Sequence, residues 1–493
     1  MQETDMSEIL LIGLDLGTQG VRAMLADSSG TILASASRRY AQINAAEKQA
    51  PAGYKEQSAD DWREAAVQVL AELTGLERER LASARVFLSV DGTSGTILPL
   101  NRENRPLRTA LMYNDGRSAC VVPEVHEAAK NLEDKLGYKI GSSFALPKIV
   151  WIRDQQPEIF EQAKAFVHQA DYIVGCLCGK YQVSDYSNAL KTGYDLLDDR
   201  WDDTVLRALS LDRSLFPEVM APGKVIGTIL PAVADATGLP RNTQIVSGAT
   251  DGYAACIASG VVRPGQYNST LGTTLVLKGV TKEFVRDPEG RVYCHKHPEG
   301  YWYPGGAGNV GGLCLNTWFE ESKFEEYNAQ VPAAVPTGNV IYPLLTKGER
   351  FPFVRPEAEG FSALVREDVI GRYAGTMEGV AYTERLCYDT LASLGCVIGD
   401  EITITGGAVK APVWSQIRAD VLGKKMVEPA VAETAFGGIL LACSAALECT
   451  VSDAAEKMVR TARVFEPDAA RHKKYEELYE AFCEACRERG YIG

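Results

Sequence analysis

One short pattern, a strand followed by a glycine-containing turn and a second strand, occurs in both halves of the 493-residue chain. Residues 9–26 contain two apolar runs separated by a small-residue turn at 15–20. Residues 265–278 repeat the arrangement around Gly272 and Thr273. Small residues in such a turn leave backbone N–H groups accessible to an anion. The repetition therefore predicts a duplicated α/β unit with a ligand cleft between its two copies.

Strand and helix patterns alternate through the rest of each half. Further strands are predicted at 31–37, 87–90, 291–295, 301–303 and 401–405, and helices at 58–73, 253–259, 313–319, 377–394 and 412–423. Ser58 and Asp61 resemble a capping box at the start of the first of these helices. Such alternation is typical of the α/β fold class.

The chain contains no long linker, so the domain boundary is placed where the strand pattern starts again. Pro264 and Gly265 interrupt the helical run that precedes them, which makes 261–265 the expected hinge. We therefore predict an N-terminal domain at 1–261 and a C-terminal domain at 262–493.

The charge balance argues against nucleic acid as a partner, and the N-terminal sequence and the cysteines indicate the cellular compartment. Acidic side chains outnumber basic ones by 65 to 51, a formal charge of −14, and an acidic surface repels nucleic acid. The apolar run near the N-terminus is short and lacks a basic flank, so neither a signal peptide nor a membrane span is expected. Twelve cysteines without secretory features indicate reduced thiols and a cytoplasmic protein.

Two aspartates lie beside these small-residue segments. Asp15 is on the first hairpin, and Asp251 follows the small-residue run 248–250 at the start of an apolar helix. A carboxylate among small residues can reach a ligand without crowding, and a helix N-terminus favours its ionised form. The alternative for Asp251 is a helix N-cap, a role that aspartate often fills.

A glycine motif favours a different function. Residues 306–311 match Gly-x-Gly-x-x-Gly between a predicted strand and a predicted helix, as in an NAD-dependent dehydrogenase. A dinucleotide site also needs an acidic residue at the end of the next strand, about 20 residues on. The proline-containing stretch 331–336 stands there instead. The dehydrogenase is kept as an alternative.

Six short motifs occur in a characteristic order along the chain. They lie at 13–20, 112–117, 248–251, 269–274, 305–309 and 405–410. With this set the chain resembles the FGGY carbohydrate kinases over nearly its whole length. The resemblance implies two RNase H-like domains of the actin and hexokinase superfamily, with ATP and a sugar in a central cleft. It also implies an enzyme that transfers a phosphate from ATP to a sugar hydroxyl, with Mg²⁺.

The resemblance also implies roles for individual residues. Asp251 would be the general base for the sugar hydroxyl, Asp15 would help to hold Mg²⁺, and both would contact the sugar together with Ser94. The residues that it implies for ATP binding are Gly17, Thr18, Gln19, Gly272, Thr273, Gly311, Gly312, Gly406, Gly407 and Ala408. Such a division suits phosphoryl transfer, which depends on positioning and charge neutralisation.

The loop around Ser94 is the main indication of which sugar is the substrate. Xylulokinases of this family usually have Gln-Met-His-Gly where this chain has Gly-Thr-Ser-Gly at 92–95. This loop, with segments 185–194, 294–296 and 348–352, resembles plant and cyanobacterial D-ribulose kinases. Segments at 114–117 and 56–57 are more similar to xylulokinases. We therefore expect D-ribulose, with D-xylulose as the alternative, while Ser94 as an ordinary turn residue stays open.

The expected ligands are a ketopentose and ATP, without nucleic acid or membrane. For the oligomeric state, a homodimer and a monomer both stay open. The remaining alternative is a non-enzymatic member of the same superfold, an ATP-binding or filament protein, because a fold does not fix a function.

Overall fold

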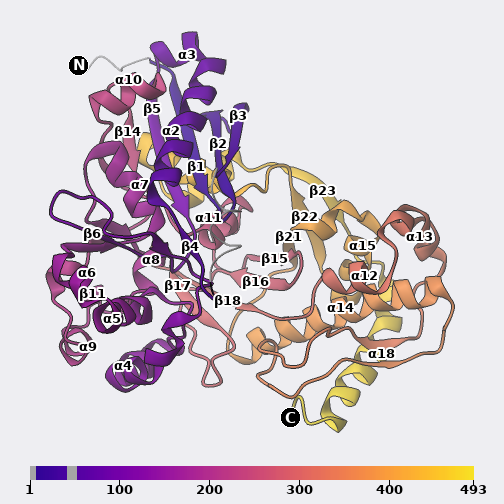
Figure 1. Ribbon diagram of the computed structural model, residues 1–493. Coiled ribbons are helices and arrows are strands. Elements are labelled where there is room, and N and C mark those ends of the chain that lie inside the picture. The colour runs from indigo at the N-terminus through magenta and orange to yellow at the C-terminus, as the bar shows by residue number, and fades with distance from the viewer. Residues whose placement is uncertain (1–6, 41–50, 52) are drawn as a thin grey trace. The chain divides into compact units, whose positions relative to one another are not determined.

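The computed structural model describes residues 7–40, 51 and 53–493, which separate into two compact units (Figure 1). Unit 1 contains the chain as far as Ala258, together with His295–Gly300 and Glu433–Val459. Unit 2 contains Ser259–Cys294, Tyr301–Ala432 and Arg460–Gly493. The domain boundary at 261–262 stays a prediction, and the sequence patterns do not indicate that two later segments join unit 1.

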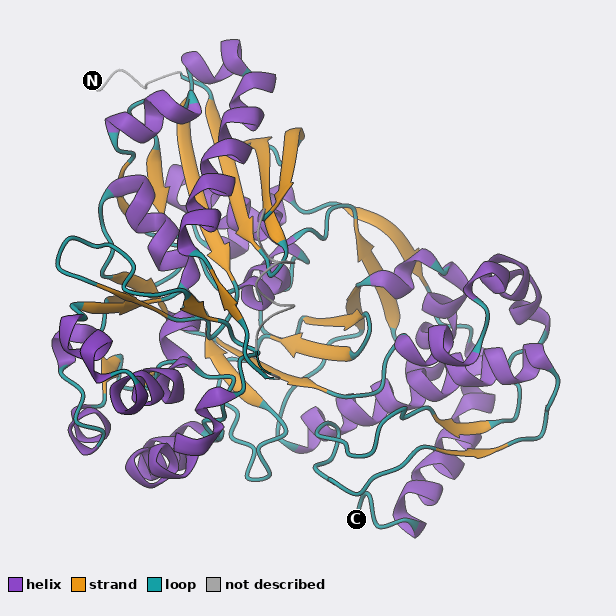
Figure 2. Ribbon diagram, viewed as in Figure 1, coloured by secondary structure: helices purple, strands orange, loops and turns teal. Residues whose placement is uncertain are grey.

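Unit 1 is built on a six-stranded sheet in the order β13-β14-β5-β1-β2-β3 (Figure 2). Its strands are β1 (Ile9–Leu16), β2 (Gly20–Asp27), β3 (Ile32–Arg39), β5 (Arg85–Gly92), β13 (Val225–Thr228) and β14 (Gln244–Val246). Strand β1 is antiparallel to β2 and parallel to β5, which is itself parallel to β14. The C-terminal ends of β1, β5 and β14 therefore meet at one edge of the sheet, where ligands bind in open α/β sheets.

Two helices, α2 (Ala59–Leu76) and α7 (Gln169–Cys178), pack against one face of this sheet. Alternate residues of a strand point to the same face, and Leu10, Ile12 and Leu14 of β1 join the apolar core under these helices. The apolar periodicity from residue 58 is therefore confirmed as a helix. Its predicted capping box is wrong, because the N-cap Ser58 makes no side-chain capping hydrogen bond.

The opposite set of β1 residues faces α16 (Thr434–Leu447), which also packs on α11 (Asp251–Ala258). A Cβ atom at Gly13 would lie 1.8 Å from the carbonyl oxygen of Ala435, and one at Gly437 would lie 2.0 Å from that of Ala254. Glycine at these positions lets the helix approach both the strand and α11 closely.

Unit 2 repeats the strand order of unit 1 with the same directions. Its strands are β15 (Tyr267–Leu271), β16 (Leu275–Gly279), β18 (Trp302–Ala307), β21 (Glu401–Thr405), β22 (Lys425–Pro429) and β23 (Thr461–Phe465). The seventh strand of the sheet is β17 (Tyr293–Lys296), of which Tyr293 and Cys294 belong to unit 2. The order β18-β16-β15-β21-β22-β23 matches β3-β2-β1-β5-β14-β13, and the central pairs are parallel in both. The predicted repeat of an α/β unit is confirmed.

In unit 2, α15 packs against both α14 and α18, and α18 also contacts α14 directly, because the Tyr475 hydroxyl donates to Glu378 at 2.9 Å. The principal helices are α12 (Leu313–Trp318), α13 (Phe324–Gln330), α14 (Val369–Ser393), α15 (Pro412–Leu422) and α18 (Ala469–Glu488). Arg418 of α15 is fully buried, and its guanidinium pairs with Glu384 of α14 at 2.7 Å and donates to Ser269 Oγ at 2.8 Å. Removing one partner would leave a buried charge unpaired, so this contact links α14 and α15 to the sheet.

The glycine motif at 306–311 does not form a dinucleotide loop. Gly306 and Ala307 belong to β18 and pair with the antiparallel strand β16. A dinucleotide fingerprint instead occupies the turn between a strand and a helix of a βαβ unit. The geometry that the dehydrogenase alternative requires is therefore lacking here, although the predicted helix after the motif is present as α12.

The remaining elements are short or lie around the two sheets. The helices are α3 (Arg78–Ala82), α4 (Val122–Leu136), α5 (Ala145–Gln155), α6 (Pro157–Gln162), α8 (Tyr186–Leu190), α9 (Asp203–Ala208), α10 (Pro231–Thr237) and α17 (Val451–Met458). The strands are β4 (Glu56–Gln57), β6 (Leu98–Leu100), β7 (Ala110–Leu111), β8 (Ala165–Val167), β9 (Val183–Asp185), β10 (Tyr194–Asp195), β11 (Arg200–Trp201), β12 (Glu218–Met220), β19 (Val340–Tyr342) and β20 (Phe361–Ala363).

Across the residues that the structure describes, no single helix is long and apolar enough to cross a membrane. Helices α16 and α17 reach the required length and composition only as a pair bent by 115°.

Candidate functional site

Three aspartates lie at neighbouring strand ends of unit 1. Asp15 is near the end of β1, and Asp91, near the end of β5, is its register partner. Asp251 is the first residue of α11, and Gly92 forms a parallel bridge with Thr250 immediately before it. The structure thus brings the two predicted aspartates together with a third carboxyl group.

Asp91 is completely buried, and no amide or hydroxyl among the described residues donates to either of its carboxyl oxygens. Burial raises the pKa of Asp91 well above its ordinary value, and the negative charges of Asp15 and Asp251 raise it further. Burial also raises the pKa of Asp15, although its hydrogen bond with Asp91 and the charge of Arg22 lower it. The Asp15–Asp91 pair therefore shares a proton, with Asp91 as the donor.

The sequence patterns did not indicate Asp91 as a site residue. A signal was present, because Asp91 ends a short apolar strand as Asp15 does. The pairing itself depends on the register of two strands far apart in the chain. It also depends on the close approach of α16, because a Cβ atom at Gly438 would lie 3.6 Å from Asp91 Oδ2 and 3.2 Å from Gly13 Cα.

The loop after β5 is held in place by the start of α7. Gln169 Oε1 accepts hydrogen bonds from the amide of Thr93 at 3.0 Å and from its hydroxyl at 2.7 Å. The hydroxyl groups of Thr93 and Thr96 are 2.7 Å apart, and His168 Nδ1 lies 3.1 Å from the Thr96 carbonyl oxygen. All four side chains are buried. The loop is thus rigid before any ligand arrives.

Ser94 lies within this fixed loop. Its Oγ atom is buried and has no hydrogen-bond partner among the described residues. Gly95 beside it has φ +86°, and a Cβ atom there would lie 2.3 Å from the Ser143 carbonyl oxygen. The Ser94 hydroxyl is therefore available to a ligand, whereas an ordinary turn serine would bond to its own backbone.

Asp251 is positioned through its neighbour on the chain. The Thr250 amide donates to Ser187 Oγ at 2.8 Å, and Ser187 Oγ donates to Asp185 at 2.5 Å. The amides of Tyr253 and the residue after it donate to the Thr250 carbonyl oxygen, which places Asp251 inside the first helical turn.

Two other buried side chains of unit 1 have a polar atom without a hydrogen-bond partner among the described residues. These atoms are Gln169 Nε2 and Asn188 Oδ1, and the sequence patterns indicated neither residue.

Each of the two predicted hairpins is closed by the amide of its glycine, across four residues in unit 1 and three in unit 2. In unit 1 the Gly17 amide closes the turn on the Gly20 carbonyl oxygen at 3.0 Å, and in unit 2 the Gly272 amide bonds to Thr274 at 3.1 Å. Within the described residues, the amides that follow, on Thr18 and on Thr273, donate to no other group. Such open amides in a small-residue turn suit a phosphate group.

A pocket of about 790 Å³ in unit 2 contains several residues of the predicted nucleotide site. The predicted residues that line it are Gly272, Thr273, Gly312, Gly407 and Ala408. A Cβ atom at Gly272 or Gly407 would meet nothing within 4 Å, so both glycines leave open space. The volume lies in the range of small-molecule sites, which is about 300–1,000 Å³, and suits a nucleotide.

Gly311 and Gly406 do not line this pocket. A Cβ atom at Gly311 would lie 2.4 Å from the Thr273 carbonyl oxygen. Gly406 has φ +91°, and a Cβ atom there would lie 2.5 Å from the Leu271 carbonyl oxygen. Both glycines let their segments pack closely against the hairpin around Gly272. A direct role of Gly311 and Gly406 in ATP binding stays a prediction.

Three helices contribute pocket residues that sequence reasoning missed. They include Asn316 of α12, Tyr373 and Met377 of α14, and Trp414 of α15. The Trp414 indole donates to the Met377 carbonyl oxygen at 3.2 Å, which fixes one wall. In the sequence these residues differ in no way from other residues of amphipathic helices.

The segments that are similar to xylulokinases form an internal ion-pair network. Arg117 pairs with Glu56 at 2.7 Å and with Asp115 at 2.8 Å, and Glu56 also pairs with Arg108 at 2.6 Å. The amide of Lys55 donates to Asp115 at 2.6 Å. These side chains are occupied with one another, so they account for structure in unit 1 without a ligand.

In the part of the chain that the structure describes, no three His, Cys, Asp or Glu side chains come together as a metal site. Mg²⁺ differs from zinc in this respect, because proteins usually hold it through one or two carboxylates and the phosphates of the substrate. Asp15 and Asp91 supply two neighbouring carboxyl groups, and no described amide or hydroxyl donates to that of Asp91, which fits that requirement.

Comparison with known proteins identifies relatives along nearly the whole chain. The xylulose kinase of Bacillus subtilis is 26% identical, covering 96% of this chain and 95% of the relative, and the gluconokinase of Bacillus licheniformis is 25% identical, covering 97% and 95%. Among solved structures, the xylulose kinase from Rhodospirillum rubrum has a TM-score of 0.86 at 26% identity, covering 97% and 98%. The xylulose kinase from Brucella ovis has a TM-score of 0.87 at 24% identity, covering 98% and 99%.

Two family profiles cover most of the sequence. The N-terminal domain of the FGGY family of carbohydrate kinases matches residues 10–258, and the C-terminal domain matches residues 267–446. The expected fold of the actin and hexokinase superfamily is confirmed by the structural matches. With its repeated α/β units and its aspartate-containing strand ends, the chain belongs to the FGGY family of carbohydrate kinases.

Proposed function

We propose that this carbohydrate kinase transfers the γ-phosphate of ATP to the terminal hydroxyl of D-ribulose, forming D-ribulose 5-phosphate. The observation that carries the choice of sugar is the Ser94 hydroxyl, which is buried in a rigid loop and has no partner among the described residues. Sugar kinases of this family use ATP. The proposal therefore concerns the acceptor, the roles of individual residues and the metal.

Asp251 acts as the general base. Its position in the first turn of α11, with Thr250 held by Ser187, fixes the carboxylate relative to the strand ends. It accepts the proton of the sugar hydroxyl as that oxygen attacks phosphorus. A base of ordinary strength is sufficient, because phosphoryl transfer depends mainly on positioning and charge neutralisation.

Asp15 contacts the sugar and helps to hold Mg²⁺, and Asp91 orients the Asp15 carboxyl group through the shared proton. When bound, Mg²⁺ would neutralise negative charge on the phosphates. Asp91 is completely buried, so its geometry does not relax into solvent as that of a surface carboxylate would.

The nucleotide occupies the 790 Å³ pocket of unit 2. The open amide of Thr273 and the space left by Gly272 and Gly407 accommodate the phosphates and the adenosine. The hairpin amides of Thr18 and Gln19 in unit 1 serve as further phosphate donors. Local amides matter because a protein with a formal charge of −14 does not attract ATP through its overall field.

D-Xylulose is the second candidate, because several relatives are named xylulose kinases. The segments of this chain that are similar to those enzymes are 56–57 and 114–117. In the structure Glu56 and Asp115 both pair with Arg117. These residues therefore give less information about the sugar than Ser94 does.

A coupled assay of ADP release tests the proposal. The purified protein is supplied with ATP, Mg²⁺ and one acceptor at a time, from a panel of D-ribulose, D-xylulose, L-ribulose, D-gluconate and glycerol. We expect the highest kcat/KM with D-ribulose. A higher value with D-xylulose or gluconate would replace the proposed acceptor, and no acceptor-stimulated ADP release at all would contradict the kinase proposal.

A further inference from the structure

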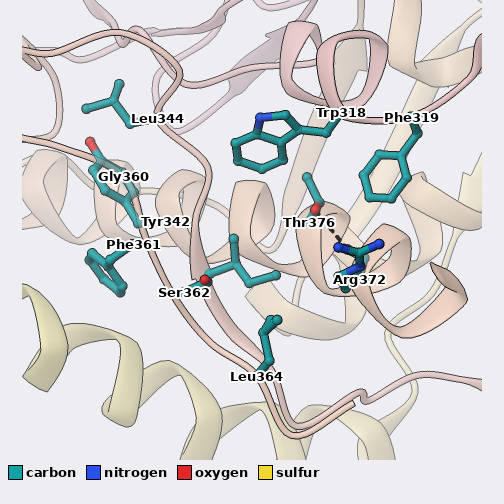
Figure 3. Close-up of a pocket in the computed structure, with 11 residues that line it drawn as sticks. Trp318, Phe319, Tyr342, Leu344, Gly360, Phe361, Ser362, Leu364, Arg372 and Thr376 are labelled. Atoms are coloured by element: carbon teal, nitrogen blue, oxygen red, sulfur yellow. Dashed lines mark hydrogen bonds between the residues drawn. The ribbon is translucent and has the colours of Figure 1, made fainter. Parts of the chain in front are cut away.

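Unit 2 contains a second cavity, of about 390 Å³, on a face of α14 next to the one that borders the nucleotide pocket. Figure 3 shows Trp318, Phe319, Phe361 and Leu364 around it, with Arg372 next to Phe319 at one end. None of its lining residues lines the nucleotide pocket. The cavity, here called the α12–α14 cavity, has no role in the proposed phosphoryl transfer.

The lining of the α12–α14 cavity is apolar and partly open to solvent. The side chain of Trp318 is 46% exposed and that of Leu364 is 36% exposed, although both are large and apolar. Contiguous apolar surface of this kind commonly marks a binding site, and 390 Å³ is within the usual size range for small ligands.

Arg372 adds a positive charge to this apolar lining. Its guanidinium forms no ion pair with any described residue, whereas the nearby Arg366 pairs with Asp368 at 2.7 Å. The Thr376 hydroxyl is already used, because it donates to the Arg372 carbonyl oxygen at 2.8 Å. The guanidinium therefore stands available beside aromatic side chains, and a planar guanidinium suits a carboxylate, sulfonate or phosphate group.

We propose that the α12–α14 cavity binds a small aromatic anion, a molecule with an apolar ring system and one acidic group. The rings pack against Trp318, Phe361 and Leu364, and the acidic group pairs with Arg372. Charge complementarity distinguishes this ligand from a neutral apolar molecule, which would leave the guanidinium without a partner.

The same two helices border the nucleotide pocket. On α12, Leu313 lines the nucleotide pocket and Trp318 lines the α12–α14 cavity. On α14, Tyr373 lies on the nucleotide side, while Arg372 and Thr376 line the cavity. A ligand that shifts either helix changes both pockets, so we expect the cavity and the nucleotide pocket to be energetically coupled.

The test uses 1-anilinonaphthalene-8-sulfonate, a fluorescent aromatic anion, titrated into the full-length protein with saturating ADP present. We expect saturable binding of one probe molecule per chain. Arg372→Gln and Leu364→Glu should each weaken that binding about tenfold or more, as expected for a lost charge-assisted bond and for a charge placed in the apolar lining. The neutral analogue N-phenyl-1-naphthylamine should be insensitive to Arg372→Gln.

Val365→Glu is the matched control, because Val365 is 78% exposed and does not line the cavity. It adds the same charge one residue away from Leu364 and should leave probe binding unchanged. Equal probe affinity in the wild type, Arg372→Gln and Leu364→Glu would overturn the proposal. The dissociation constant of ADP, measured with and without bound probe, should differ, and equal values would overturn the coupling.

Discussion

Asp15 and Asp91 are register partners on the parallel strands β1 and β5, and their carboxyl groups share a proton in a part of unit 1 that α16 covers. The pair explains how a chain can hold a fully buried acidic side chain beside a partly buried one. One of them stays neutral and donates to the other, which limits the cost of burying like charges.

Substitutions of Asp91 distinguish this donor role from a charge requirement. Asp91→Asn keeps a donor for Asp15, so turnover should stay within about threefold of wild type, whereas Asp91→Ala removes it. Loss of the donor should lower the free energy of unfolding by about 1–3 kcal/mol and turnover by about tenfold or more. Urea unfolding and steady-state kinetics measure the two effects. Equal losses in both variants would contradict the donor role.

Asp251→Asn should remove the general base while keeping the shape of the side chain. We expect kcat to fall by about 10²–10⁴-fold, with the KM of the sugar little changed, because the base acts on the transition state. Asp235→Asn is the matched control, since Asp235 is exposed and, among the described residues, pairs only with Arg241 at the surface. Turnover of Asp251→Asn equal to that of the control would remove Asp251 from the mechanism.

Gln169 should act on the sugar through the loop that contains Ser94. Gln169→Glu keeps the oxygen that accepts from the Thr93 amide, whereas Gln169→Leu leaves that buried amide unpaired. Loss of such a bond costs about 1–3 kcal/mol, so Gln169→Leu should raise the KM of the sugar about tenfold. The KM of ATP, measured in parallel, should not change. A matching rise in the KM of ATP would indicate general loss of structure instead.

The glycines of unit 2 should divide into two groups. The Cβ atom that Gly407→Ala adds would meet no protein atom within 4 Å. The melting temperature of this variant should therefore equal that of wild type, while ADP should bind to it more weakly. Gly311→Ala would bring a Cβ atom to 2.4 Å from the Thr273 carbonyl oxygen, and unit 2 should lose stability. Differential scanning calorimetry and ADP titration separate the two effects. Tight ADP binding by Gly407→Ala would show that nucleotide does not fill that space.

Glu378 of α14 should make stability depend on pH. Burial raises its pKa from 4.5 to about 7, although Thr337 and Tyr475 donate hydrogen bonds to its carboxyl group. The folded protein therefore favours the protonated form. The contribution of this group to stability is fully present below about pH 4.5 and is lost as the pH rises towards about 7.

Glu378→Gln stays neutral at every pH, so it should become more stable relative to wild type between pH 5 and pH 7. The difference should rise by up to about 1.4 kcal/mol per pH unit and then level off. Urea unfolding at several pH values measures it. Glu367→Gln, a change at an exposed glutamate, should give a difference that does not vary with pH.

The features that could be read from the sequence are those that local physics controls. The hairpins around Asp15 and Gly272, the helix that begins at Pro412 and the helix stop at Gly423 depend on turn chemistry and on periodicity over a few residues. The ordered motifs also indicated the family. These features can be predicted without any knowledge of long-range contacts.

Other features depend on which distant segments come to lie side by side. The proton shared by Asp15 and Asp91 requires a specific strand register and the approach of α16, and the Gln169 contact joins residues 76 positions apart. Gly407 and Gly311 have similar sequence surroundings, yet one faces open space and the other packs on a hairpin. Periodicity predicts that a residue is buried on one face of an element. Its partners follow only from how whole elements pack, because each contact must satisfy volume, charge and hydrogen bonding with residues elsewhere in the chain.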